Sequence, residues 1–137
     1  MPSLEDRRAL DSHNHLRGHY PKVVMGNGAD RSADILQGTL ELLILRTLAS
    51  GEKHGYEIAE WIHSASAEAL SVEEGALYPA LHRLELRGWL AASWDVSANN
   101  RRAKYYRLTA SGRKRLRDTT DAWRRTSTAI NRVLETP

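Results

Sequence analysis

The segment from Val96 to Arg117 carries a concentration of positive charge that is suited to binding phosphates. It holds eight of the 20 Lys and Arg residues and no Asp or Glu. The other 12 basic residues are outnumbered by 17 acidic ones, so the net charge of +3 hides an acidic body with one basic edge. A localised basic surface is typical of nucleic-acid-binding proteins, because it attracts the polyanionic backbone and displaces its counterions.

The first basic residues of this segment lie at the tip of a predicted β-hairpin. Trp89–Asp95 and Lys104–Leu108 are extended by composition, with apolar and polar residues alternating. Side chains at such a tip can enter the minor groove of DNA or bind its phosphates. We expect this of Asn99, Asn100, Arg101, Arg102 and Lys104. The alternative is a solvated charge run without a partner, which the complete absence of acidic residues disfavours.

Helical periodicity predicts two helices well before the hairpin. Residues 39–49 are apolar around most of the helix circumference, which indicates a buried first helix. Residues 56–64 form an amphipathic second helix, whose inward side is expected to hold Tyr56, Ile58, Ala59 and Ile62. His54 and Tyr56 lie at its start, where the helix dipole favours a DNA phosphate. The alternative for these two residues is a turn histidine and a core tyrosine.

A third helix carries an inward stripe of Leu77, Leu81 and Leu84 and ends at Gly88. Ser71 and Glu74 have the spacing of a capping box at its start. Such a third helix is the recognition helix of a helix-turn-helix, where Arg can read guanine and Tyr can reach a phosphate or a thymine methyl. Its predicted outward residues are Gly75, Ala76, Tyr78, Pro79, His82 and Arg83. Alternatively, Tyr78 packs on the domain and His82 is merely solvated.

The last part of the chain reads as one long helix from a cap at Thr109 to about residue 134. Its apolar residues are Leu116, Trp123, Ile130, Val133 and Leu134, the first three of them seven residues apart. A heptad-spaced seam on a lone terminal helix requires a partner, most simply a second copy. We therefore predict a homodimer that is joined through this helix. The other three tryptophans, Trp61, Trp89 and Trp94, are expected to pack in the core or against the domain.

In order and spacing, these segments resemble the PadR-like transcriptional regulators over most of the chain from residue 36 to 134. The resemblance rests on GTLELLILRTL, HGYEIAEWI, LYPALHRLELRGWL, the wing with RRAKYY, and LTASGR. It implies a DNA-binding homodimer that is more often a repressor than an activator. The short tail resembles the subgroup with a single C-terminal dimerisation helix. In some drug-sensing relatives the residue matching Trp123 stacks on flat aromatic ligands, so a small aromatic effector is a further expectation.

The predicted fold is mostly α with a small β-hairpin wing, a winged helix-turn-helix followed by a long dimerisation helix. Residues 34–108 form the DNA-binding domain and residues 109–137 the dimerisation helix. Residues 1–33, which depart from the family pattern, lack any helix or strand period and are expected to be a flexible arm. Met25 offers an alternative start of the protein.

Several classes of function are disfavoured by what the chain lacks. It has no cysteine, no apolar run long enough to span a membrane and no signal-peptide pattern, so we expect a cytoplasmic protein without a membrane partner. His13 and His15 are too few ligands for a metal site, and no cofactor motif or catalytic grouping is present. The rival hypothesis is a winged-helix adaptor that binds proteins and not DNA; an enzyme is the weakest alternative.

Overall fold

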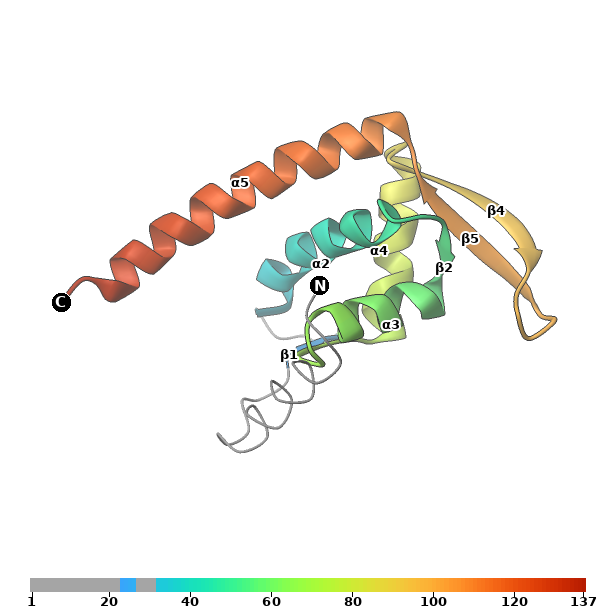
Figure 1. Ribbon diagram of the computed structural model, residues 1–137, viewed down its shortest axis with the longest axis horizontal. Helices are drawn as coiled ribbons and strands as arrows, with labels where there is room; N and C mark the ends of the chain where they lie inside the picture. The colour runs from blue at the N-terminus through green and yellow to red at the C-terminus, as the bar shows by residue number, and fades with distance from the viewer. Residues whose placement is uncertain (1–22, 27–31) are drawn as a thin grey trace, which may run out of the picture.

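The computed structural model describes residues 23–26 and 32–137, and the side chains of the second range from residue 38 onward. His13, His15 and most of the expected arm lie outside the described residues. In chain order, the elements are β1 (Val23–Met25), α2 (Ser32–Leu48), β2 (Lys53–His54), α3 (Gly55–Ala65), β3 (Leu70–Val72), α4 (Glu74–Leu86), β4 (Leu90–Val96), β5 (Arg102–Leu108) and α5 (Ala110–Glu135). The predicted fold class, mostly helical with a hairpin wing and a long last helix, is confirmed (Figure 1).

One apolar core joins the three helices α2, α3 and α4. α2 is buried on most sides, as its composition predicts, whereas α3 and α4 each contribute one face. The side chains at most 2 % exposed include Leu40, Ile44, Leu45, Leu48, Ile58, Ile62, Leu77, Leu81 and Leu84. Burying a leucine of this size contributes roughly 1.5–3 kcal/mol. The predicted leucine stripe of the third helix is therefore the side by which α4 is held in the domain.

The wing is the outer part of a three-stranded antiparallel sheet with the order β2-β5-β4. β4 and β5 form the predicted hairpin, with Leu90 paired to Leu108 at its base and Val96 to Arg102 near its tip. Figure 1 shows the hairpin projecting from the helical body. β2 adds to β5 by pairing His54 with Tyr105. Tyr105 and Tyr106 divide as expected for adjacent strand residues, because Tyr106 is only 5 % exposed and Tyr105 faces the other side.

The expectation of a structureless arm is wrong for Val23–Met25. These residues form β1, which pairs in parallel with β3. The backbone amide of Glu73 donates to the carbonyl of Met25 (3.0 Å), and the Met25 side chain enters the core at 3 % exposure. Three residues are too few for a period to be recognised, and the pairing depends on a partner strand 47 positions away in sequence.

The capping box expected at Ser71 and Glu74 is also wrong. Ser71 lies within β3, and α4 begins one residue after Glu73, which makes no side-chain cap. The capping box is found instead at α3. The Nδ1 atom of His54 accepts from the amide of Glu57 (3.4 Å), and a Glu57 carboxylate oxygen accepts from the His54 amide (3.2 Å). Pairing with β1 holds residues 70–72 extended and so moves the start of α4.

The end of α4 and the start of α5 follow the predicted chemistry. Gly88 has φ +77°, the left-handed conformation that glycine adopts most easily, and the amide of Trp89 donates to the carbonyl of Leu84 (3.1 Å). Thr109 caps α5 by accepting from the Gly112 amide (3.0 Å). α5 then runs along α2 and leaves the domain body (Figure 1). Among the described helices, none combines the length and apolarity needed to cross a membrane.

The strand formed by Val23–Met25 predicts a measurable contribution of Met25 to stability. Met25→Ala should lower the free energy of unfolding by about 2–4 kcal/mol, because it removes a buried side chain and leaves a cavity. Val24→Ala is the matched control, since Val24 is 49 % exposed on the same strand. Urea denaturation of both variants measures the difference. Equal stabilities would show that this strand is not part of the core.

Candidate nucleic-acid interface

The face of α4 opposite its leucine stripe is open. Gly75, Tyr78, Pro79 and His82 are exposed, as predicted for a recognition helix, and Tyr78 is 48 % exposed. Ala76, which was expected on this face, instead packs partly against the core. The Tyr78 ring also lies against Gly55 of α3, so the alternative in which it packs on the domain holds for part of the side chain. His82 is exposed, without a partner among the described residues.

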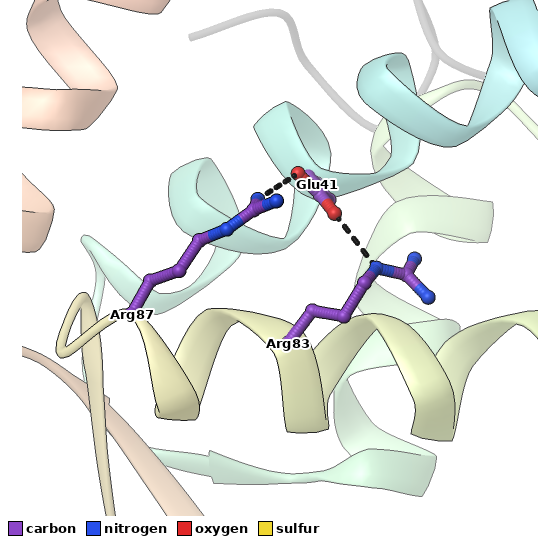
Figure 2. A network of polar contacts seen from close by, with 3 residues as sticks. All are labelled: Glu41, Arg83 and Arg87. Carbon is purple, nitrogen blue, oxygen red and sulfur yellow. Dashed lines mark hydrogen bonds and ion pairs between the residues drawn. The ribbon is translucent and has the colours of Figure 1, made fainter.

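Arg83 departs from the expected outward orientation. Its Nε atom donates to Oε1 of Glu41 on α2 (3.0 Å), and Arg87 donates from Nη1 to Oε2 of the same carboxylate (3.3 Å). Figure 2 shows the three side chains meeting between the two helices. Helical geometry explains the difference, because position 83 lies on the flank of α4 that faces α2. The network was missed in the sequence, although Glu41 is the sole acidic residue in the apolar run 39–49.

The tip of the wing is a tight turn that presents its side chains to solvent. The amide of Asn100 donates to the carbonyl of Ser97 (2.9 Å), and the amide of Ser97 donates to the carbonyl of Arg101 (2.7 Å). Asn100 has φ +57°, a left-handed conformation that asparagine tolerates better than most residues. Asn99, Asn100, Arg101 and Arg102 are all exposed, as predicted.

Lys104 lies further from the tip than predicted and is turned toward α4. Its Nζ donates to Oε2 of Glu85 on α4 (2.9 Å) and lies 5.4 Å from the ring centroid of Tyr106. The hydrogen bond to Glu85 raises the pKa of Lys104, so its ammonium stays charged at neutral pH. The pair joins the wing to α4 and leaves Arg101 and Arg102 as basic groups of the tip that form no ion pair with the described residues.

Trp94 was expected to pack in the core but is 58 % exposed on the wing. The guanidinium carbon of Arg102 lies 4.9 Å from the centroid of its ring, a cation–π contact across the two strands. The contact restricts the long Arg102 side chain close to the tip. By contrast, Trp61 and Trp89 are partly buried against the core, as predicted.

At the start of α3, His54 matches the structural alternative that was considered for it, whereas Tyr56 does not. His54 is engaged in the capping box and touches the edge of the Tyr105 ring (5.4 Å between centroids), which matches the turn-histidine alternative. Tyr56 is 67 % exposed, so the core-tyrosine alternative and its predicted inward position are wrong. The hydrogen bond to the Glu60 carboxylate raises the pKa of Tyr56.

Comparison with known proteins decides the family. Residues 44–118, more than half of the chain, match the Transcriptional regulator PadR-like family. The chain belongs to this family. It is a winged-helix transcriptional regulator and not an enzyme. Within the described residues, no group of three or more His, Asp or Glu residues could hold a metal ion.

Three relatives illustrate the range of similarity. The chain is 32 % identical over 104 residues to Uncharacterized protein X of Lysinibacillus sphaericus, covering 75 % of this chain and 94 % of the relative. It is 29 % identical to the Negative transcriptional regulator PadR of Bacillus subtilis, over 58 % of this chain and 43 % of that protein. The solved structure of a transcriptional regulator from Clostridium thermocellum has a TM-score of 0.66 and 31 % identity, over 72 % of this chain and 96 % of that one.

The long α5 of this PadR-like regulator presents an apolar face without a covering element in the described chain. Trp123, Ile130, Val133 and Leu134 are 49–75 % exposed. Leu116, which was expected in the same seam, instead packs partly against the core of its own domain. The exposed face therefore begins about two turns further along α5 than the heptad spacing predicts.

A groove of about 340 Å³ lies between α2, the end of α4 and α5. Its apolar lining includes Leu42, Leu45, Leu84, Trp89 and Trp123, and its charged lining consists of Glu41 and Arg115. The guanidinium of Arg115 lies over the ring of Trp89 (4.5 Å), and that of Arg87 also approaches this ring (5.3 Å). Glu41 thus belongs both to the wall of the groove and to the network that holds α4.

The position of Tyr78 on α4 depends on a glycine in α3. A Cβ at Gly55 would lie 2.9 Å from the Tyr78 ring, closer than carbon atoms approach. Gly55→Ala should displace the ring toward solvent and change the free energy of unfolding by less than about 1 kcal/mol, because the far end of an exposed side chain moves at low cost. In a Tyr78→Ala background the same change should become stabilising, since alanine is the better helix former.

The contact is tested by unfolding measurements on the native protein, Gly55→Ala, Tyr78→Ala and the double variant, together with NMR shifts of the Tyr78 ring in the proteins that retain it. An unchanged Tyr78 spectrum in Gly55→Ala would contradict it.

Proposed function

We propose that the regulator binds double-stranded DNA as a homodimer, with α4 in the major groove and the wing tip at the adjacent backbone or minor groove. The observation that carries the proposal is the combination of an exposed α4 face with a wing tip whose free side chains are amides and guanidiniums and never carboxylates. The exposed residues expected to contact DNA are Gly75, Tyr78, Pro79, His82, Asn99, Asn100, Arg101 and Arg102, with Tyr56 as a backbone contact.

The two halves of the dimer would contact successive turns of one face of the duplex. Recognition helices of such dimers lie about 34 Å apart, so an inverted repeat is the expected operator. Similarity to a negative regulator from Bacillus subtilis supports repression, by occupation of a promoter. Phosphate contacts supply most of the affinity, and the exposed α4 residues supply the discrimination between sequences.

Arg101 and Arg102 are expected to contact one phosphate each. Replacing both with alanine should reduce the salt slope of the logarithmic affinity by about 4 for the dimer, because its two wings lose four phosphate contacts and each contact releases about 0.9 counterion. At roughly 0.1 M salt this corresponds to about an eightfold loss of affinity per contact on every sequence. Gel shifts or fluorescence anisotropy over a salt series measure both quantities.

The matched control replaces Arg46 and Arg125, two exposed arginines outside the wing, and should leave the slope unchanged. A chain that serves as a protein adaptor would bind no duplex before or after either change. Equal losses in both double variants would indicate attraction by total charge and would contradict a role for the wing.

Dimerisation through α5 explains why one face of its second half carries exposed apolar side chains. Ile130→Asp should convert the dimer to a monomer, because it places a carboxylate in a seam that excludes water. Asn131→Asp introduces the same charge one position further along, on a different side of the helix, and should leave the dimer intact. Sedimentation of both variants provides the measurement, and a dimer that survives Ile130→Asp would exclude this seam.

The groove beside Trp123 is the candidate site for a small aromatic effector. Its volume lies within the range of small-molecule sites, and two tryptophan rings supply flat surfaces for stacking. An occupant that moved Glu41 or Leu84 would act directly on α4, which both residues help to hold. Titration with planar aromatic compounds should quench tryptophan emission in the native protein and much less in Trp123→Phe. Identical quenching in the two proteins would argue against the site.

A further inference from the structure

Glu41 occupies a position that a core helix rarely gives to a carboxylate. Its side chain is 16 % exposed and lies between α2 and α4. Each of its two oxygens accepts from a different arginine of the recognition helix, Arg83 through Nε and Arg87 through Nη1. With two guanidiniums and one carboxylate the cluster keeps a net positive charge, so Glu41 does not cancel its attraction for phosphates.

The hydrogen bond from Nε leaves the two terminal guanidinium nitrogens of Arg83 available for other partners. Only Nε faces Glu41, and Figure 2 shows the two terminal nitrogens pointing away from the carboxylate. Those nitrogens donate no hydrogen bond to any described side chain, and the Arg83 side chain is 31 % exposed. The terminal nitrogens of arginine form the forked pair that binds guanine O6 and N7, or two oxygens of one phosphate.

A tether of this kind has an energetic consequence for binding. A free arginine side chain loses on the order of 1.5–2 kcal/mol of rotamer freedom when it is fixed in one geometry. Arg83 has already lost much of that freedom before any partner arrives, because Glu41 holds the guanidinium near its centre. Pre-organisation of this kind increases affinity for a partner that fits the fixed geometry and gives no advantage to one that does not.

We propose that Glu41 is a positioning residue for DNA recognition, which holds Arg83 by Nε so that its terminal nitrogens face the edge of a base at the side of the groove. The inference rests on the proposed function and adds a specificity-determining residue from outside the recognition helix. It also restores to Arg83 a role in reading DNA, from the flank of α4 and not from its outermost line.

The contrary role for Glu41 would be to sequester Arg83 from DNA. The two roles predict changes of opposite sign in the affinity for DNA when the Glu41 carboxylate is removed. Removing a carboxylate that sequesters a cation strengthens binding to every sequence, whereas removing one that orients the cation weakens binding to the preferred sequence alone. Electrostatics alone also favours tighter binding after the removal, so a loss of affinity cannot be attributed to charge.

The test uses Glu41→Gln in the full chain, a change that keeps the size of the side chain and removes its charge. Binding is measured to a duplex recovered with the native protein from random DNA and to a shuffled duplex of the same composition. We expect about a tenfold loss for each half-site of the recovered duplex, the value of one forked contact, and no loss on the shuffled one. Glu52→Gln, which removes an exposed carboxylate that forms no ion pair with Arg83, should bind both duplexes as the native chain does.

A double-mutant cycle assigns the loss to Arg83. Glu41→Gln should have no further effect in an Arg83→Ala background, because the residue that it positions is gone. Arg83→Lys keeps the positive charge but lacks the forked pair of nitrogens, and it should lose affinity for the recovered duplex to a similar extent. This variant provides an independent test if a thermal melt shows that Glu41→Gln is poorly folded.

The outcomes separate this inference from the proposed function. Native affinity or better in Glu41→Gln, or losses that add in the double variant, would overturn the role of Glu41 while leaving DNA binding intact. Failure of the native chain to bind any duplex would overturn both.

Discussion

The structure depends on the burial of one side of α4. Leu77, Ala80, Leu81 and Leu84 are at most 2 % exposed, and they fix the rotation of the helix against α2 and α3. Because a helix has two sides, the same packing turns Gly75, Tyr78, Pro79 and His82 to solvent. The exposed face of α4 is therefore a direct consequence of core packing, and it requires no additional structural element.

Two carboxylates then connect α4 to its neighbours. Glu41 holds its α2 side through Arg83 and Arg87, and Glu85 holds its wing side through Lys104. Pairs of this exposure contribute little to stability, about 0–1 kcal/mol each, so their main effect is on orientation. α4 and the wing therefore keep a fixed spacing. The groove between α2, α4 and α5 is lined by Glu41 and Leu84, so it shares residues with this arrangement. An occupant of the proposed effector groove would therefore contact residues that also help to hold α4.

Local patterns predicted much of this arrangement. The three helices, the hairpin, the Thr109 cap and the exposed wing tip follow from periodicity and turn chemistry, which act over a few residues. Features that depend on distant partners were missed or misplaced. β1 needs β3, the cap at Ser71 is lost to that pairing, and Arg83 and Lys104 turn toward carboxylates on other elements. Trp94 was assigned to the core because of its type, whereas its place on the projecting wing decides its exposure.

Selection of bound sequences from random duplex DNA tests the central claim most directly, because it depends at once on binding, symmetry and spacing. If paired α4 surfaces are held by a dimeric α5, the enriched sequences will contain an inverted repeat whose half-sites are separated by about one helical turn, or a multiple of it. No enrichment in dilute buffer, or enrichment of a single unpaired half-site, would contradict the account.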